Sequence, residues 1–283
     1  MIDLIYLNAF IDNALREDIG DGDHTSLACI PSTNEGKAKL LIKGKGILAG
    51  IDIAQQIFHR FDPLMKITVF INDGAKVFTG DVALTVEGQI LSILQCERLV
   101  LNTMQRMSGI ATQTNRYVEE LKGTSTKLLD TRKTTPGVRL LEKEAVRIGG
   151  GDNHRVGLFD MILIKDNHID FAGGIEKAID AVHQYLQKHD KTLKIEIETR
   201  NLNDVERVLK HGKIDRIMFD NFDIATVSKA VEMVDGRYET ESSGNINIDN
   251  IRDYALCGVD YISVGALTHQ IKCLDMSLKA VEN

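Results

Sequence analysis

The sequence lacks the features that mark several large classes of protein. Its net charge is -7, so a general affinity for the phosphates of nucleic acids is not expected. No apolar run approaches the roughly 18 residues that a membrane-spanning helix requires. The opening residues MIDLIYLNAF carry neither a basic region nor a cleavage site. These absences predict a cytoplasmic protein that binds no nucleic acid and no membrane.

Local signatures of metal and nucleotide sites are also missing. The four cysteines are far apart and form no CxxC pair, which favours reduced, buried or half-buried thiols over a zinc site: Cys29, Cys96, Cys257 and Cys273. No GxGxxG motif opens a strand–helix unit, and this weighs against a Rossmann fold. The triple glycine at 149–151 is not followed by GK[ST], so it is a weak phosphate loop.

The first part of the chain predicts a mixed α/β domain. Residues 3–17 place apolar side chains at helical spacing, and residues 36–90 contain short alternating runs separated by turns, as strands do. A long helix is predicted over 90–122. One of its faces carries three polar residues spaced by four, Arg98, Asn102 and Arg106. By default such a face contacts solvent or a neighbouring domain or subunit. The alternative is that Arg98 has a functional role.

From about residue 125, apolar strand-like runs alternate with helical patterns. The six runs are LLD (128–130), MILIKDNH (161–168), LKIEIETR (193–200), DRIMFDN (215–221), RYETESSG (237–244) and DYISVGAL (260–267). Several of the intervening helices end in glycine, which is a common helix cap. Alternation of this kind indicates parallel strands joined by helical crossovers. Six in succession favour a closed or nearly closed β/α barrel over an open sheet.

Each of the six runs ends in polar residues. In a β/α barrel these ends surround one mouth, where the chemistry takes place. One side of the predicted mouth is cationic and suits a carboxylate or phosphate ligand: Arg132, Lys133, His154, Arg155 and Lys165. Glu198 and Asp220, on successive strands, form an anionic pair that suits Mg²⁺.

The last two strands are followed by small residues. Ser243-Gly244-Asn245 and Gly265-Ala266 offer backbone N–H groups where such barrels often bind phosphate. The glycines at 149–151 are expected to end a helix over 138–148 and to let His154 and Arg155 reach the mouth. The mouth is therefore predicted to hold a phosphorylated sugar with Mg²⁺ and, beside it, an acid.

At these residues the sequence resembles the quinolinate phosphoribosyltransferase family. The resemblance extends from EDIGDGDHTS to the end of the chain. Its most specific motifs are DTRKTTPG, GGGDNHR and MILIKDNHI, and EIET, FDN, ESSGNI and DYISVGALTH follow in order. The resemblance implies an N-terminal α/β sandwich domain over 1–110, joined by segment 270–283, and a C-terminal incomplete β/α barrel over 111–269 that carries the active site.

The resemblance also implies an activity and its partners. Members convert quinolinate and phosphoribosyl pyrophosphate into nicotinate mononucleotide, pyrophosphate and CO₂ in NAD biosynthesis. They are pentosyltransferases, also called nicotinate-nucleotide diphosphorylases (carboxylating), and work with Mg²⁺ as homodimers or multiples of dimers such as hexamers. Arg98 is similar to an arginine that completes a neighbouring subunit's site.

By similarity, the remaining roles fall on the strand ends. Quinolinate binding is implied for Arg132, Lys133, Thr134, His154, Arg155 and Lys165, with Lys133, Lys165, Glu198 and Asp220 as the catalytic set. Glu198 and Asp220 match the ribose and metal positions, with metal contact partly through water and substrate. The 5′-phosphate loops are Ser243, Gly244 and Asn245, and Val264, Gly265 and Ala266. Asn245 departs from the pattern, because many members have a second glycine there.

Three alternatives accompany this interpretation. One is a relative of the same fold associated with molybdenum transport. Another is a Schiff-base aldolase with Lys165 as the nucleophile at a strand end. The third is a non-catalytic binding or carrier protein, suggested by DGAKVFTGDVALTVEG. That stretch lacks the modifiable lysine of a biotinyl or lipoyl carrier, so a structural sheet is the favoured interpretation of it.

Overall fold

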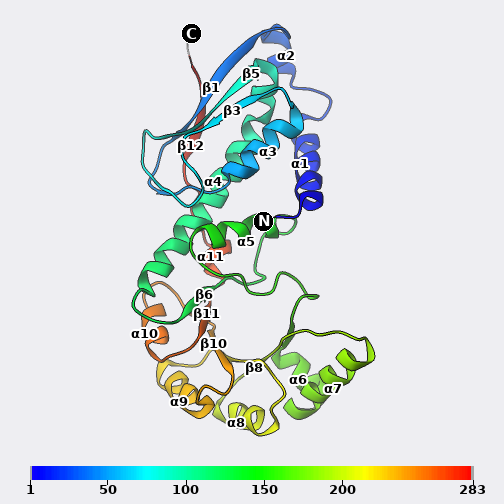
Figure 1. The fold of residues 1–283 in the computed structure, drawn as a ribbon, viewed down its shortest axis with the longest axis vertical. Coiled ribbons are helices and arrows are strands. Elements are labelled where there is room, and N and C mark those ends of the chain that lie inside the picture. The colour runs from blue at the N-terminus through cyan, green and yellow to red at the C-terminus, as the bar shows by residue number, and fades with distance from the viewer. Residues whose placement is uncertain (1, 282–283) are drawn as a thin grey trace. The chain divides into compact units, whose positions relative to one another are not determined.

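The computed structural model describes residues 2–281, and the chain divides into two compact units (Figure 1). The second unit consists of Arg116–Lys133 and Gly151–Ala266, and the first contains the other described residues. Residues 134–150 thus belong to the first unit, although they lie inside the range 111–269 expected for the barrel. The motif DTRKTTPG is divided between the units after Lys133.

The first unit contains a four-stranded antiparallel sheet in the order β12-β1-β5-β3 and a small sheet, β2-β4. Its strands are β1 (Glu35–Ile42), β2 (Gly46–Ile47), β3 (Lys66–Val69), β4 (Lys76–Val77), β5 (Val82–Gln89) and β12 (Met276–Ala280). Its helices are α1 (Leu4–Ile19), α2 (His24–Cys29), α3 (Ile51–Phe61), α5 (Arg139–Ile148) and most of α4 (Ile90–Glu120). A short helix, α11 (Ala266–His269), begins at the unit boundary.

The core of the first unit is apolar. Along β1 the side chains alternate, so that Leu40 and Ile42 are fully buried, and Leu40 pairs with Leu84 of β5. Ile57 and Phe58 of α3 are also fully buried. On α4, Gly109 permits a close approach of the C-terminal segment, because a Cβ there would lie 2.6 Å from the carbonyl oxygen of Lys272. That segment then enters the sheet as β12, beside β1.

The second unit contains a six-stranded parallel sheet in the order β6-β11-β10-β9-β8-β7. Its strands are β6 (Lys127–Leu129), β7 (Ile162–Ile164), β8 (Ile195–Thr199), β9 (Arg216–Asp220), β10 (Glu239–Ser243) and β11 (Tyr261–Ser263). The helices between them are α6 (Asp166–Ala172), α7 (Ile175–Lys188), α8 (Leu202–His211), α9 (Ile224–Val234) and α10 (Ile251–Leu256). Because β6 and β7 end the order and do not pair, this is the predicted incomplete β/α barrel.

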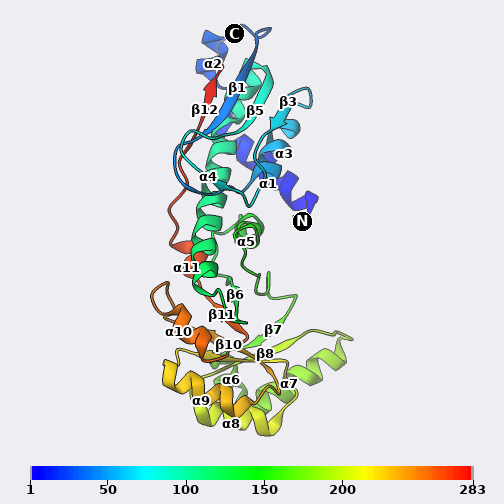
Figure 2. The same ribbon diagram turned by 60° about the vertical axis from the view of Figure 1, so that its left-hand side comes forward.

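The two faces of this sheet differ in chemistry. Helices α8 and α9 contact β8 and β10 and lie on one face of the sheet (Figure 2). Ile197 and Ile217, neighbours in the strand register, are fully buried in the apolar layer. Side chains alternate along each strand, so Glu196 and Arg216, which also pair, lie on the opposite face. The interior of the barrel is therefore lined with charge.

One residue extends the sheet beyond β6. Asp152 forms a parallel bridge with Leu129, and its N–H donates to the carbonyl of Leu128 at 2.8 Å. The chain from 153 to 161 then continues without a helix or strand until β7 begins. This segment contains His154 and Arg155, so both are supplied at the open side of the barrel.

The cysteines are free thiols, as expected, but their predicted burial is wrong at two positions. Cys96 is buried and Cys257 is half-buried, whereas Cys29 and Cys273 are exposed. The spacing of the cysteines argues against a zinc site, but it does not indicate whether each thiol faces the core or the solvent. Among the described residues, no helix is both long enough and apolar enough to span a bilayer.

Candidate functional site

The strand ends of the second unit bring several predicted site residues to one edge of the sheet. In the register, Asp220 of β9 is paired with Ser243 of β10, and Ser243 is paired with Ser263 of β11. The Ser263 hydroxyl donates to the Ser243 hydroxyl at 2.9 Å. Glu198 lies one residue before the end of β8. These positions form a continuous polar rim.

Lys165 and Glu198 are in direct contact. The Lys165 ammonium donates to Glu198 Oε1 at 2.7 Å, and the N–H of Asp166 donates to Oε2 at 3.3 Å. Lys165 follows β7 and its side chain is half exposed, whereas Glu198 is buried. Schiff-base lysines are activated by apolar surroundings or by another cation. A carboxylate facing Lys165 therefore gives the aldolase alternative no support.

The loop after β10 is joined to Asp220 by asparagine side chains. Asn221 donates from Nδ2 to Asp220 Oδ2 at 2.8 Å, and Asn245 Nδ2 donates to Asn221 Oδ1 at 3.0 Å. A Cβ on Gly244 would collide with the Asn221 side chain, so glycine is required there. Asn245 has φ 54°, in the left-handed region that glycine and asparagine tolerate best. Asparagine in place of a second glycine therefore suits this backbone.

One of the predicted cationic site residues has a buried hydrogen-bond donor that lacks an acceptor. Arg132 Nε is buried and has no acceptor among the described residues. Burial lowers the pKa of Arg155, and the neighbouring charge of Arg132 lowers it further. Arg155 is itself buried, with one guanidinium nitrogen donating to the carbonyl of Met161 at 3.2 Å. Lys133 is exposed, and its N–H donates to the Thr131 hydroxyl. Two repelling guanidinium groups in this setting favour binding of an anion.

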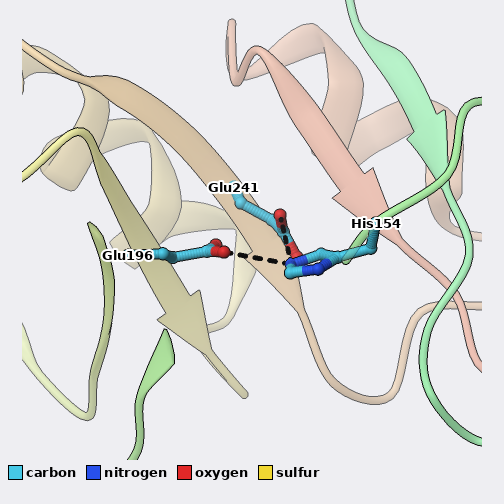
Figure 3. A group of neighbouring side chains, drawn as sticks. All are labelled: His154, Glu196 and Glu241. Carbon is cyan, nitrogen blue, oxygen red and sulfur yellow. Dashed lines mark ion pairs between the residues drawn. The ribbon is translucent and has the colours of Figure 1, made fainter. Parts of the chain in front are cut away.

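His154 does not point toward the rim. Its Nε2 lies 3.0 Å from Glu196 Oε2 and 3.5 Å from Glu241 Oε2, and the side chain is only 6% exposed (Figure 3). The N–H of Arg155 donates to Nδ1 at 2.7 Å, which places the ring hydrogen on Nε2, facing the carboxylates. Both ring nitrogens of His154 are thus engaged within the chain.

The carboxylates below the rim are held by Arg216. Its guanidinium lies 3.0 Å from Glu241 Oε2 and 3.2 Å from Glu239 Oε2, and it stacks on the Tyr261 ring at 3.9 Å. Glu196 and Glu241 have completely buried side chains. Sequence reasoning did not single out Glu241 or Arg216. The available signal was the placement of acidic residues at alternate strand positions, as in IEIE and ETES.

Burial and mutual repulsion dominate the electrostatics of this cluster. Burial, followed by the Glu241 charge, raises the pKa of Glu196 to about 7. Burial alone would lower the pKa of His154, but its contacts with Glu196 and Glu241 raise it to about 9. The Arg155 N–H at Nδ1 opposes a second ring proton there. The cluster therefore retains a proton more strongly than the same groups do in water.

His154, Glu196 and Glu241 also have the spacing of a metal-ligand set. Their donor atoms lie within 4.8 Å of one another. However, Arg216 and the His154 ring hydrogen already supply positive charge to these carboxylates, and a metal ion would be repelled by the buried guanidinium. The arrangement is that of a self-contained ion network.

The first unit holds the other two predicted residues. Arg98 is exposed on α4 and lines a cavity of about 330 Å³ together with Asn102, Arg106 and Glu142. Within that cavity, Arg106 forms an ion pair with the buried Glu142. Thr134 accepts a hydrogen bond from Arg139 Nε at 2.9 Å. Arg98 and Thr134 both belong to the first unit, whereas the polar rim belongs to the second.

Comparison with known proteins gives the same family throughout. The models "Quinolinate phosphoribosyl transferase, N-terminal domain" and "C-terminal domain" match residues 23–108 and 110–279. "Quinolinate phosphoribosyltransferase [decarboxylating] 1b" of Nicotiana tabacum is 46% identical over 96% of this chain and 82% of its own length. "Nicotinate-nucleotide pyrophosphorylase [carboxylating], chloroplastic" of Oryza sativa subsp. japonica is also 46% identical, over 96% of this chain and 77% of its own.

Solved structures agree with the sequence matches. NadC from Streptococcus pyogenes superposes with a TM-score of 0.92 at 36% identity, covering 100% of this chain and 99% of its own. The nicotinate-nucleotide pyrophosphorylase from Francisella tularensis gives 0.92 at 39% identity, covering 99% and 98%. Both domains, nearly the whole length and the fold are accounted for. The chain therefore belongs to the quinolinate phosphoribosyltransferase family.

Proposed function

We propose that this chain catalyses the decarboxylating phosphoribosyl transfer of NAD biosynthesis. Quinolinate and phosphoribosyl pyrophosphate would give nicotinate mononucleotide, pyrophosphate and CO₂. The observation that carries the proposal is the pair of guanidinium groups on Arg132 and Arg155. One of them has a buried Nε without an acceptor, and the two repel each other. A small planar diacid supplies both the missing acceptors and the missing negative charge.

The residues of the rim suit the first chemical step. The pyridine nitrogen of quinolinate attacks C1 of the ribose, the C1–O bond breaks, and its electron pair leaves with pyrophosphate. Positive charge grows at C1 as this bond lengthens, and the carboxylates of Glu198 and Asp220 favour that charge. No general base is needed, because the attacking nitrogen carries no proton.

The second step is the loss of CO₂ from C2 of the pyridinium ring. The ring nitrogen is then quaternary, so the ring accepts the electron pair of the broken C–C bond, and a proton replaces CO₂ at C2. Lys133 and Lys165 are the proposed catalytic cations. Both lysines are exposed, and the Lys165 ammonium is held by Glu198 at 2.7 Å.

Glu198 and Asp220 are the residues that would hold Mg²⁺, partly through water and substrate oxygens, since the Lys165 ammonium already contacts Glu198 Oε1. The two carboxylates are hard oxygen donors at the ends of adjacent strands, a set that suits Mg²⁺ when waters and substrate oxygens complete the shell. When bound, the ion neutralises the departing diphosphate. Glu198→Ala and Asp220→Ala should raise the Mg²⁺ and phosphoribosyl pyrophosphate concentrations needed for half-maximal rate, while quinolinate binding by calorimetry changes little.

The 5′-phosphate is assigned to the loops that follow β10 and β11. Ser243, Gly244 and Asn245 form the first loop, and Val264, Gly265 and Ala266 form the second. The left-handed backbone at Gly244 and Asn245 shapes a turn of the kind that directs N–H groups toward an anion. In this arrangement the bound 5′-phosphate would fix the position of the ribose relative to Glu198 and Asp220.

Assembly as a homodimer or hexamer is part of the proposal, with Arg98 completing the site of a neighbouring subunit and Thr134 contributing to quinolinate binding. Arg98 is exposed in the first unit, as a residue with a role in another subunit must be. Inactive Arg98→Ala and Arg155→Ala proteins should regain part of the activity when mixed under subunit exchange. A mixture that stays inactive although exchange occurs would remove the shared site. The expected location is the cytoplasm.

The reaction itself is tested with two alternative acids. Protein, Mg²⁺ and phosphoribosyl pyrophosphate are mixed with quinolinate carrying labelled carbon in its C2 carboxyl group, and labelled CO₂ and nicotinate mononucleotide are measured. We expect the two products in equal amounts. Nicotinate serves as the control substrate. Turnover of nicotinate alone would indicate the non-carboxylating reaction, and no turnover of either acid would leave the molybdenum-associated relative as the better match.

Arg155→Ala is the most direct test of the acid site. Removing one partner of a buried charged contact costs several kcal/mol in binding, so the KM for quinolinate should rise by about 100-fold or more. The fold should be retained, because Arg155 is repelled by Arg132 before substrate arrives. Melting temperature provides the control. A variant with unchanged quinolinate kinetics would remove Arg155 from the substrate site.

A further inference from the structure

A buried ion network lies beneath the proposed acid site and has no direct part in the chemistry above. It connects three strands and one loop of the second unit. Arg216 of β9 contacts Glu241 of β10, and Glu241 and Glu196 of β8 both contact the His154 ring (Figure 3). Such a network is costly to bury, since each charge gives up its hydration. Its retention in the barrel interior calls for a role.

The network ends on the main chain of Arg155. His154 Nε2 faces the two carboxylates, while Nδ1 accepts the Arg155 N–H at 2.7 Å. The N–H of His154 itself is held by Asp130 Oδ1 at 2.8 Å. The ring of His154 therefore forms a rigid link between the strands and residue 155. The segment around it, residues 153–161, has no helix or strand to hold it.

Arg155 needs such a link because its neighbours push it away. Before substrate binds, its guanidinium is near Arg132, and the charge of Arg132 disfavours the charged form of Arg155. Its guanidinium donates a hydrogen bond to the Met161 carbonyl at 3.2 Å, which gives it one polar anchor within the segment. An arginine on an irregular segment beside a like charge would otherwise turn toward water, and substrate binding would have to restore its position.

We propose that Glu196 and Glu241, backed by Arg216, are positioning residues that act through His154 to hold Arg155 ready for the diacid. In this role His154 orients Arg155 through the hydrogen bond at Nδ1. The inference rests on the proposed function, because it assigns Arg155 to quinolinate. The inference adds Glu196, Glu241 and Arg216 to the residues proposed to support quinolinate binding. It assigns them no direct contact with the substrate.

The test is a double-mutant cycle on the full-length protein. Glu196→Gln and Glu241→Gln keep the side-chain shape while removing the charge. Each should raise the KM and the calorimetric Kd for quinolinate about 10- to 100-fold, the range seen when a supporting partner of a binding group is lost. The KM for phosphoribosyl pyrophosphate should change by less than about twofold. In an Arg155→Ala background, Glu241→Gln should add less than about twofold, because its effect passes through Arg155.

Two replacements of His154 separate the two ends of the link. The amide oxygen of asparagine lies where Nδ1 lies and can accept the Arg155 N–H, but the side chain is too short to reach the carboxylates. The amide nitrogen of glutamine lies where Nε2 lies and can contact the carboxylates, but it offers no acceptor at the Nδ1 position. His154→Asn and His154→Gln should both weaken quinolinate binding, because each breaks one end of the link. These variants leave Glu196, Glu241 and Arg216 intact, so they supply the test if a glutamate variant fails to fold.

Glu239→Gln is the matched control. Glu239 also contacts Arg216, but its side chain is 35% exposed, and the carboxylates that His154 contacts are those of Glu196 and Glu241. Replacing Glu239 should leave the quinolinate KM within about twofold. The inference is overturned if folded Glu196→Gln, Glu241→Gln and His154 variants bind quinolinate like the parent. It is also overturned if the effects of Glu241→Gln and Arg155→Ala multiply. An unchanged quinolinate KM in Arg155→Ala alone would instead contradict the proposed function of that residue.

Discussion

The interiors of the two units are built from different chemistry. In the first unit the buried positions of β1 and α3 are aliphatic or aromatic, and the sheet is antiparallel. In the second, one face of a parallel sheet is aliphatic, and the other carries buried Glu196, Glu241 and Arg216. The comparison teaches that the sheet of the first unit buries only apolar side chains along β1, and that unit's buried charges, Glu142 and Lys143, lie on α5 instead. The sheet of the second unit, by contrast, carries an aliphatic layer on one face and buried charge on the other. Charge is concentrated on the face nearest the proposed substrates.

The largest expected effect tests whether this charge also holds the second unit together. Arg216→Ala would leave the fully buried carboxylate of Glu241 without its guanidinium and should lower the free energy of unfolding by about 3 to 5 kcal/mol. Chemical denaturation monitored by circular dichroism measures it. Lys194→Ala is the control, since Lys194 also pairs with Glu239, at 3.6 Å, but is 62% exposed and should cost less than about 1 kcal/mol. Equal losses for the two variants would mean that burial of the network is unimportant.

The pH dependence of stability should distinguish the interiors next. Burial, followed by the Glu241 charge, raises the pKa of Glu196 to about 7 in the folded protein, above its ordinary value of 4.5. The folded state therefore binds more protons, and this stabilisation is fully present below pH 4.5 and lost as the pH rises through 7. The melting temperature should fall across this interval, because Glu196 faces Glu241, His154 and Arg216 in the barrel interior. Glu196→Gln should flatten the curve. A parent curve that is already flat would contradict the retained proton.

The smallest effect concerns the aliphatic layers, in which the units should behave alike. Ile57 in the first unit and Ile217 in the second are both fully buried. Ile57→Val and Ile217→Val each remove one methylene group and should cost about 0.5 to 1.5 kcal/mol in unfolding free energy. Both should leave the KM values unchanged. If Ile217→Val altered quinolinate binding as strongly as Glu241→Gln, the distinction between the aliphatic and the charged face would be wrong.

Much of the second unit follows from the sequence, because strand and helix patterns alternate in an order that parallel sheets require. The six predicted strands are those observed, and Glu198, Asp220 and Ser243 lie near or at strand ends because their runs end there. Local pattern also suffices for Asn245, whose small polar side chain suits a left-handed turn.

Other features depend on contacts between distant parts of the chain. Glu196 stands between Ile195 and Ile197, a pattern that in a single strand indicates a solvent-facing side, and Glu241 is flanked by polar Thr240 and Ser242. Only closure of the sheet around these side chains makes that side an interior. The contact of His154 with Glu196 could not be predicted, because the two are joined by no local pattern. Likewise, the return of residues 134–150 to the first unit depends on tertiary packing.

The lack of pairing between β6 and β7 has a consequence for how the proposed quinolinate pocket can evolve. A lone bridged residue, Asp152, pairs beside β6, and the irregular segment 153–161 after it contains Arg155. Insertions or deletions there would alter the reach of the arginine without shifting the ladder of any neighbouring strand. Because β6 and β7 do not pair, the length of the segment between them can change during evolution and alter the size of substrate that the pocket accepts, while the six paired strands keep their register.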